Sequence, residues 1–400
     1  MTKIAPEATQ APTRTSGSML VLATVGFALT FWAWALLSPL GSHLREQLGL
    51  TSFQQAVLVA VPVIVGSLGR IPVGALTDRL GGRVMFAVMA LLTILPVLYL
   101  GYVADSFGTY ILGGFFLGLG GTTFAIGIPF VNSWFPPQRR GTALGLFGMG
   151  MGGTAISAFT TVQLSQKIGP EFPFTLVAIL LAIYAAVAWV AMRDRPDRPR
   201  AGGTMMSRTM SALKMRSTIE LALLYAVSFG GFVAFSVYLP TYLKTAYHLT
   251  QSDAAFRTAG FVVLAVIMRP IGGWLSDRYH PVAVLTFAYA IGLFLALGAA
   301  MEWKLVPLGT MFLLGLAAVL GLGTGGVFAL VPRLTPQEKV GAVTGVVGAA
   351  GGLGGFFPPL VMGAVYGAVG DYTLGFLLLA LVALAALAYT ALVIRPRAAA

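Results

Sequence analysis

The chain has 400 residues, of which 57% are hydrophobic and only 10% are charged, and 25 Lys and Arg against 13 Asp and Glu give a formal net charge of +12. Because a soluble domain carries about 25% charged residues, this composition excludes a soluble enzyme, and a mean hydropathy of +0.87 excludes a disordered or nucleic-acid-binding chain. It indicates a polytopic membrane protein. Cysteine is absent, which excludes disulfides and cysteine-ligated metals, and we expect no metal or cofactor.

Twelve apolar stretches follow a Thr-, Ala-, Pro- and Ser-rich segment, 1–18, which we predict to be a disordered cytoplasmic tail. Each stretch is near or above the ~20 residues that an α-helix needs to cross ~30 Å of hydrocarbon, and none alternates like a barrel strand. The sequence therefore predicts an all-α integral membrane protein with twelve transmembrane helices. We place them at 19–40, 53–77, 84–103, 108–133, 141–163, 173–192, 217–243, 253–275, 282–300, 305–331, 340–366 and 372–394.

One long polar linker, 193–216, divides the chain into six-helix halves at 19–192 and 217–394. If the termini are inside, few of the basic residues fall in outer loops, namely Arg45, Lys167, Lys244, Arg257 and Lys304. This asymmetry predicts that both termini, including the tail 395–400, are cytoplasmic and that the protein lies in the inner membrane. We expect the basic linker to face anionic lipid rather than nucleic acid, and we expect a monomer.

The two halves carry an internal sequence repeat. Residues 70–79 (RIPVGALTDR) end the second span and residues 269–278 (RPIGGWLSDR) end the eighth, at a shift of 199 residues. At a shift of 200 residues, four glycines of span five fall on four glycines of span eleven: Gly141, Gly145, Gly148 and Gly152 on Gly341, Gly345, Gly348 and Gly352. Because each copy has an even number of spans, both run in the same direction. This predicts two pseudo-symmetric halves about an axis along the membrane normal.

The run 74–83 resembles the loop signature between helices two and three of the major facilitator superfamily. Asp78 lies at the cytoplasmic end of its span, where the positive N-terminal dipole of helix eleven attracts a carboxylate, and Asp277 is placed to serve helix five by symmetry. We predict inward-side latches that hold in one state and release in the other, formed by Asp78, Arg79, Arg83, Asp277 and Arg278. The alternative is that these loop charges serve solubility and topology only.

Two further arginines, Arg70 and Arg269, each precede a loop aspartate by eight residues. At 1.5 Å per residue they lie ~12 Å into a ~30 Å layer, close to its midplane, where each costs ~2.5–3.5 kcal/mol. No Asp or Glu lies in the middle of a predicted span. Because a guanidinium presents two parallel N–H donors to a planar oxyanion, we predict that both arginines bind an anion from outside the protein. The alternative is that backbone carbonyls or hydroxyls satisfy them.

The arginines also bear on how transport is driven, because an arginine does not release its proton and cannot take part in a proton relay. Exchange of one anion for another therefore fits the predicted core better than a proton relay, although proton-coupled uptake through water or the substrate stays open. Glycine doublets at the centres of spans five and eleven either pack helices closely or also expose backbone amides to the substrate.

Several segments resemble the nitrate/nitrite porter family of the major facilitator superfamily: 120–127, 134–145, the glycine-rich span five, and 345–359. The likeness runs over essentially all twelve spans. It implies that Arg70 and Arg269 grip the anion and that neighbouring residues surround it, which here are Phe31, Phe124, Tyr225, Phe229, Gly150, Met151, Gly351 and Gly352. The family usually carries Asn where this chain has Met151, and a thioether cannot donate a hydrogen bond. The preference between nitrate and nitrite therefore stays open.

These observations predict transport of nitrate, nitrite or both by alternating access, in nitrate/nitrite exchange. Proton-coupled nitrate uptake and a porter for small organic anions such as formate or oxalate are the alternatives. An anion sensor would need a folded cytosolic domain, for which the linker is too short. An enzyme is not expected, because the predicted spans contain no Cys, no His and no carboxylate pair for acid–base chemistry.

Overall fold

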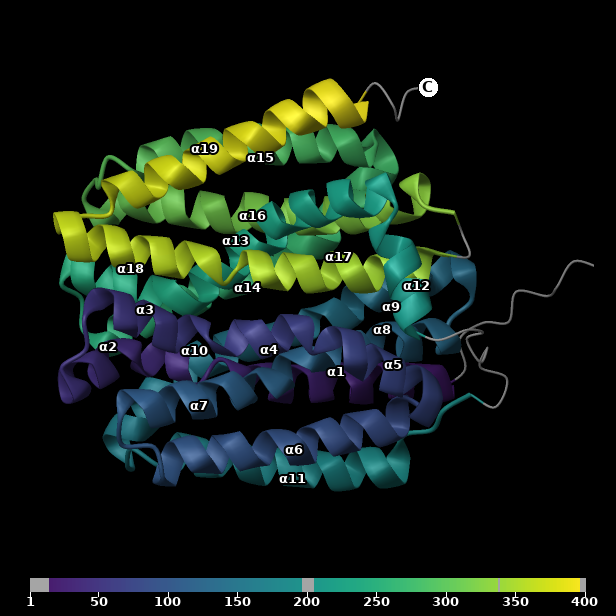
Figure 1. Cartoon of the computed structure of the whole chain (residues 1–400), viewed down its shortest axis with the longest axis horizontal. Helices are drawn as coiled ribbons and strands as arrows, with labels where there is room; N and C mark the ends of the chain where they lie inside the picture. Colours follow the sequence, from purple (N-terminus) through teal and green to yellow (C-terminus); the bar gives the residue numbers. More distant parts are fainter. Residues whose placement is uncertain (1–13, 196–204, 337–338, 396–400) are drawn as a thin grey trace, which may run out of the picture.

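The computed structural model describes residues 14–195, 205–336 and 339–395, and these residues form helices without any strand. Eleven helices are long and apolar enough to cross a membrane, and a bent pair, Ser52–Leu68 with Arg70–Leu80, makes a twelfth. The predicted all-α membrane architecture is therefore confirmed. In Figure 1 the purple-to-teal helices of the first half occupy the lower part of the bundle and the green-to-yellow helices of the second half lie above them.

The six spans of the first half are interrupted in several places. In chain order its elements are α1 (Arg14–Trp34), α2 (Leu37–Leu48), α3 (Ser52–Ala60), α4 (Pro62–Leu68), α5 (Arg70–Leu80), α6 (Gly82–Tyr102), α7 (Phe107–Leu117), η1 (Gly118–Thr122), α8 (Thr123–Trp134), α9 (Pro137–Gly148), η2 (Met149–Gly152), α10 (Gly153–Lys167) and α11 (Phe172–Ala191). Here η1 and η2 are short 3₁₀ turns.

The second half follows a short helix, α12 (Met205–Leu213), and has longer unbroken spans. Its elements are α13 (Arg216–Tyr247), α14 (Gln251–Tyr279), α15 (Pro281–Ala299), η3 (Leu305–Gly309), α16 (Thr310–Leu334), α17 (Val340–Gly354), α18 (Phe357–Val369), α19 (Thr373–Tyr389) and η5 (Thr390–Ile394).

The breaks in spans two, four and five fall on glycine-rich sequence. Span two bends by 40° between α4 and α5, where Gly69 separates the two helices. Spans four and five pass through 3₁₀ turns with the sequences GLGGT and MGMG. Glycine costs about 1 kcal/mol in a helix interior, and a 3₁₀ turn is tighter than an α-helical one. These sequences therefore allow the helices to change direction at the centre of the bundle.

Other glycines let helices approach each other to backbone contact. A Cβ atom added at Gly153 would lie 1.9 Å from the carbonyl oxygen of Ala28, so that α10 and α1 touch without an intervening side chain. The neighbouring Gly152 is different, because a Cβ atom there would meet nothing within 4 Å. Close approach of this kind is the usual role of small residues between membrane helices.

This pair gives a stability prediction. Gly153→Ala should lower the thermal unfolding midpoint of the detergent-solubilised protein, since overpacking costs about 1–3 kcal/mol. Gly152→Ala should leave the midpoint unchanged or raise it, because alanine has the higher helix propensity. Both midpoints can be followed by light scattering or by fluorescence during heating. Equal midpoints for the two variants would contradict the proposed contact between α1 and α10.

The two halves are joined at one end of the bundle, which we call the distal end because it lies opposite α12 and the C-terminus (Figure 1). There α3 packs on α18 and α2 packs on α13. Side-chain contacts that cross between the halves there include Ser38 Oγ to the Val237 carbonyl (2.8 Å), Gln55 Nε2 to Thr241 Oγ1 (2.9 Å), Lys244 Nζ to Glu46 Oε1 (2.6 Å), and Gln251 Nε2 to the Pro39 carbonyl (2.9 Å). Gln55 is only 1% exposed, so the distal end is closed.

Two predicted boundaries differ from the structure. Helix α1 begins at Arg14, within the tail predicted at 1–18, because Ser16 and Met19 are buried against the bundle and hold its first turns. Residues 1–13 lie outside the described part of the chain. The linker predicted at 193–216 contains α12, which packs against α17 through a face that includes the buried Thr209 and Ala212.

The rest of the predicted linker and tail is described only in part. Residues 196–204 of the linker and 396–400 of the C-terminal tail lie outside the described ranges. Helix α12 lies beside the end of the bundle that also carries the C-terminus, and we call this the tail end (Figure 1).

Candidate functional site

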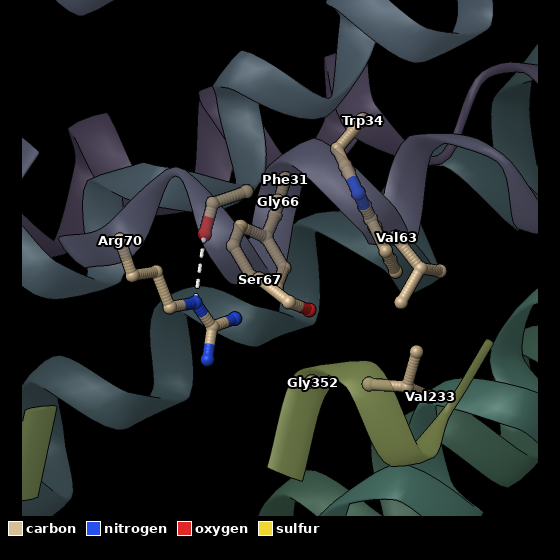
Figure 2. Close-up of a pocket in the computed structure, with 9 residues that line it drawn as sticks. Phe31, Trp34, Val63, Gly66, Ser67, Arg70, Val233 and Gly352 are labelled. Atoms are coloured by element: carbon tan, nitrogen blue, oxygen red, sulfur yellow. Dashed lines mark hydrogen bonds between the residues drawn. The ribbon is translucent and has the colours of Figure 1, made fainter. Parts of the chain in front are cut away.

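Arg70 lies inside the bundle, at the boundary between the two halves. It is the first residue of α5, immediately after the bend in span two, and it is 6% exposed. Its Nη1 donates to the carbonyl of Gly348 in α17 (2.6 Å), and its Nε lies 3.4 Å from the carbonyl of Gly121 in η1, as the dashed line in Figure 2 shows. Because α17 belongs to the second half, Arg70 bridges the two halves.

Arg269, the repeat partner of Arg70, also reaches the opposite half but contacts a different residue there. It lies in the middle of α14 and is half-buried, and its Nη1 contacts Sδ of Met151 in η2 of the first half. Within the described residues, no Asp or Glu forms an ion pair with Arg269 or Arg70. A guanidinium has five N–H donors, so two carbonyls at Arg70 and one thioether at Arg269 leave most donors available to an anion.

An aromatic wall surrounds both guanidinium groups. The ring centroid of Phe124 lies 5.1 Å from Arg70 Cζ and 5.6 Å from Arg269 Cζ. On the other side, Phe229 lies 5.6 Å from Arg70 and Phe328 lies 5.5 Å from Arg269. Cation–π attraction within about 6 Å helps to hold a desolvated guanidinium in place. The two arginines therefore share one ring and are each flanked by a second.

Tyr225 connects the two flanking rings. Its ring stacks on Phe229 with a centroid distance of 4.9 Å and an angle of 6°, and it meets Phe328 edge-on at 4.8 Å. Tyr225 is fully buried, and its hydroxyl lies beside the guanidinium of Arg269. Three of the aromatic residues expected at the site, Phe124, Tyr225 and Phe229, thus lie together at the arginines.

Phe328 is a site residue that the sequence analysis missed. At a shift of 200 residues the counterpart of Phe124 is Thr324, which lies one helical turn before Phe328 on α16. The internal repeat therefore indicates the correct helix, α16, but a position one helical turn before the aromatic residue that lies at the site. The position of Phe328 within the glycine-rich stretch of α16 is the signal that would have indicated it.

A small cavity, with room of about 10 Å³ for the centres of water-sized molecules, lies next to Arg70. Phe31, also expected at the site, forms part of its wall (Figure 2). The lining residues are Phe31, Trp34, Val63, Gly66, Ser67, Arg70, Gly121, Val233 and Gly352. The space beside Arg70 therefore suits a small ion better than a larger organic molecule.

The glycines predicted at the site have different neighbours. A Cβ atom added at Gly150 would lie 2.5 Å from the ring of Phe27, and one at Gly351 would lie 2.0 Å from the ring of Tyr225. These two glycines therefore make room for aromatic rings of their own halves. By contrast, Gly352 faces Arg70 Nη1, 3.6 Å from an added Cβ atom.

Two other glycines also face the arginines. A Cβ atom added at Gly148 would lie 3.6 Å from Arg269 Cζ, and one added at Gly348 would lie 3.9 Å from Arg70 Nη1. These residues are a matched pair of the internal repeat, and each lies in the half opposite to its arginine. The repeat thus contained the signal for a glycine opposite each guanidinium.

The predicted latch residues lie at the tail end. Helix α5, which carries Asp78 and Arg79 in its last turn, packs against α17, the helix to which the latch of Asp78 was assigned. Arg83 donates from Nε to the Trp189 carbonyl (2.8 Å) and lies over the ring of Trp189. The carboxylate of Asp194 accepts from the backbone N–H of Gly82 (2.7 Å) at the start of α6.

The latch residues of the second half, Asp277 and Arg278, form no side-chain hydrogen bond or ion pair with helix five among the described residues. Asp277 and Arg278 are exposed, and Arg278 lies over the rings of Trp274 and Tyr279 on its own helix. Asp277 has no hydrogen-bond or ion-pair partner among the described residues. The latch remains a prediction.

Comparison with known proteins adds the family context. The model of the family described as Major Facilitator Superfamily matches residues 23–356 and 221–400. A protein of Mycobacterium tuberculosis named "Probable nitrate/nitrite transporter NarK2" is 50% identical over 384 residues, which cover 95% of this chain and 97% of the relative. The "Nitrite extrusion protein" of Bacillus subtilis is 37% identical over 367 residues, which cover 92% of this chain and 91% of the relative.

A further relative and a solved structure agree with these matches. The "Probable nitrate transporter NarT" of Staphylococcus epidermidis is 34% identical over 370 residues, covering 92% of this chain and 94% of the relative. The crystal structure of a bacterial homologue of the human lysosomal transporter Spinster, in an inward-facing and occupied conformation, superposes with a TM-score of 0.74. It covers 96% of this chain and 98% of that chain at 16% sequence identity, and so confirms the predicted fold with two six-helix halves.

Proposed function

The chain belongs to the nitrate/nitrite porter family of the major facilitator superfamily, and from this premise we propose that it exchanges nitrate and nitrite across the membrane by alternating access. As a member of this superfamily it is a multi-pass membrane transporter and not an enzyme. The names of its relatives support nitrate and nitrite as the substrates, since relatives named for transport of either ion or of both cover more than nine-tenths of this chain.

The observation that carries the proposal is the pair of inward-facing guanidiniums without an acidic partner among the described residues. Arg70 and Arg269 both lie beside the ring of Phe124, where their like charges repel each other in a low-dielectric surrounding. An anion between them offsets that repulsion and accepts their N–H groups in its own plane. Aromatic ring faces above and below a planar anion leave its edge free for the guanidinium donors.

The same geometry links anion binding to movement of the halves. Without an anion, Arg70 holds a carbonyl of α17 and Arg269 contacts a residue of η2, so each arginine bridges to the opposite half. A bound anion replaces these contacts and halves the net charge of the two guanidiniums, and the halves can then rock past each other while the glycine-rich helices slide. An empty site keeps its charge and resists this reorientation. Exchange follows without a proton relay.

Sidedness is part of the proposal. The excess of basic residues in the loops and tails of the tail end supports a cytoplasmic position for both termini, in the inner membrane. The protein is proposed to act as a monomer, with the two halves of one chain enclosing one anion. In this orientation the closed distal end faces away from the cytoplasm.

Counterflow in proteoliposomes tests the exchange. Vesicles loaded with nitrite should accumulate isotope-labelled nitrate from outside, vesicles without internal anion should take up little, and an imposed pH gradient should not change the rate. Excess formate or oxalate outside should not compete. Uptake into unloaded vesicles that follows the pH gradient would instead establish proton-coupled transport, and strong competition by formate or oxalate would favour the organic-anion alternative.

A further inference from the structure

Ser67 is a buried hydroxyl that the mechanism above does not use. It lies three residues before Arg70 in span two, it is 1% exposed, and its side chain lines the cavity beside Arg70. Positions three residues apart share one face of a helix. Figure 2 accordingly shows Ser67 and Arg70 on the same side of the bent span, both toward the space in front of α17.

The Ser67 hydroxyl differs from comparable hydroxyls in the spans. Thr77, Thr93 and Ser276 each donate to the backbone carbonyl four residues earlier, at 2.8, 2.7 and 2.7 Å. The Ser67 hydroxyl makes no hydrogen bond to any residue that the structure describes. Buried polar groups are nearly always hydrogen-bonded in native proteins, so this hydroxyl is suited to a partner that the chain does not supply.

Few of the residues that line the cavity carry a hydrogen-bond donor that could bind a ligand. Among its lining residues, only Trp34, Ser67 and Arg70 have a side-chain N–H or O–H group. The indole Nε1 of Trp34 already donates to the carbonyl of Pro62 (3.2 Å). Ser67 and Arg70 therefore supply the available side-chain donors of this cavity.

These two donors converge on one point. A Cβ atom added at Gly352 of α17 would lie 2.2 Å from Ser67 Oγ and 3.6 Å from Arg70 Nη1. Because Gly352 has no side chain, the Ser67 hydroxyl and the Arg70 guanidinium can both approach the backbone of α17 at this point. An oxyanion held by Arg70 there would place a further oxygen within reach of the hydroxyl.

We propose that the Ser67 hydroxyl donates to the third oxygen of nitrate and thereby favours nitrate over nitrite. The proposal rests on the proposed function, since it concerns the substrate of the same site. Two parallel N–H groups of a guanidinium occupy two oxygens of a planar anion, which are all the oxygens that nitrite has. Nitrate has a third oxygen, whose lone pairs can accept from Ser67 as well as from Arg269, whereas Met151 cannot serve it, because a thioether is no donor.

The test compares both anions in the same variants. Counterflow and ligand-induced thermal stabilisation in detergent should be measured for Ser67→Ala, Ser67→Thr and the control Ser276→Ala, whose hydroxyl bonds within its own helix away from the cavity. In Ser67→Ala the KM for nitrate should rise about 10-fold relative to that for nitrite, as expected for one lost hydrogen bond to a charged group. Ser67→Thr keeps a hydroxyl and should retain the preference, and the control should match the wild type.

Other outcomes overturn the proposal. An equal loss for nitrate and nitrite in Ser67→Ala would make Ser67 a packing or positioning residue for Arg70, and no change for either anion would remove it from the site. The thermal measurement reports binding even where transport of a variant is poor. Failure of the proposed function is distinguishable, because the wild-type protein would then show neither exchange nor stabilisation with either anion.

Discussion

Arg70→Lys and Arg269→Lys should each reduce nitrate counterflow by about 10–100-fold, although both keep the positive charge. Lysine is a compact point charge, whereas arginine holds two parallel donors in a rigid plane. Losing one hydrogen bond to a charged group costs about 1.5–3 kcal/mol, and every 1.4 kcal/mol is about tenfold in affinity. Arg70→Lys also loses the contact with the Gly348 carbonyl, so the larger effect is expected at this position.

The control for this experiment lies on the same helix as Arg269. Arg257 is near the distal end of α14 and pairs with Asp253 one turn away (3.1 Å), where both side chains are partly exposed. Exposed pairs of this kind contribute little, so Arg257→Lys should transport at the wild-type rate. Gel filtration and the thermal midpoint in detergent show whether each variant is folded. Transport within threefold of wild type in both Arg70→Lys and Arg269→Lys would contradict the anion-binding role.

The course of the spans and the placement of the two arginines could be predicted from sequence because both follow from simple physics. Long apolar runs must be helices in lipid, and an arginine at a span centre, without an acid in the middle of any span, is costly enough to indicate a site. The sequence repeat also marked Gly148 and Gly348 as equivalent before the structure placed them opposite Arg269 and Arg70.

Other features depend on packing that sequence periodicity does not report. The bend at Gly69 and the 3₁₀ turn Gly118–Thr122 are set by neighbouring helices, since glycine permits a break but does not require one. Helix α12 was missed because its sequence is short and polar, and its buried face exists only against α17. Ser67 could not be singled out either, because any serine in a span is expected to bond back to its own helix.

Packing against neighbouring helices also decides which of the predicted glycines face the two arginines. Gly150 and Gly351 were expected to expose backbone to the anion, yet each accommodates an aromatic ring, Phe27 and Tyr225. A glycine-rich helix has one face toward the cavity and others toward its neighbours, and the face cannot be assigned without knowing where the neighbours lie. The two arginines, once placed, identify the cavity face as that of Gly148, Gly348 and Gly352.

A disulfide across the distal end should abolish transport. A Cβ atom added at Gly367 of α18 would lie 3.8 Å from Cβ of Ser52 in α3, which equals the mean Cβ–Cβ separation of a disulfide, ~3.8 Å. The two helices belong to opposite halves. The natural chain contains no cysteine, so the pair Ser52→Cys and Gly367→Cys can form only this bond. Oxidised vesicles should show background counterflow, and a reducing agent should restore the rate of the single variants.

This cross-link separates movement from binding, because it acts at the distal end and leaves Arg70 and Arg269 unchanged. If the distal end must open in every cycle, the oxidised protein still binds nitrate from the tail end, and nitrate should raise its thermal midpoint as in the wild type. Loss of transport with binding intact would therefore assign the defect to the blocked rocking of the halves. Wild-type counterflow by protein whose cross-link is verified by mass spectrometry would show that the distal end need not open, and alternating access between these halves would be wrong.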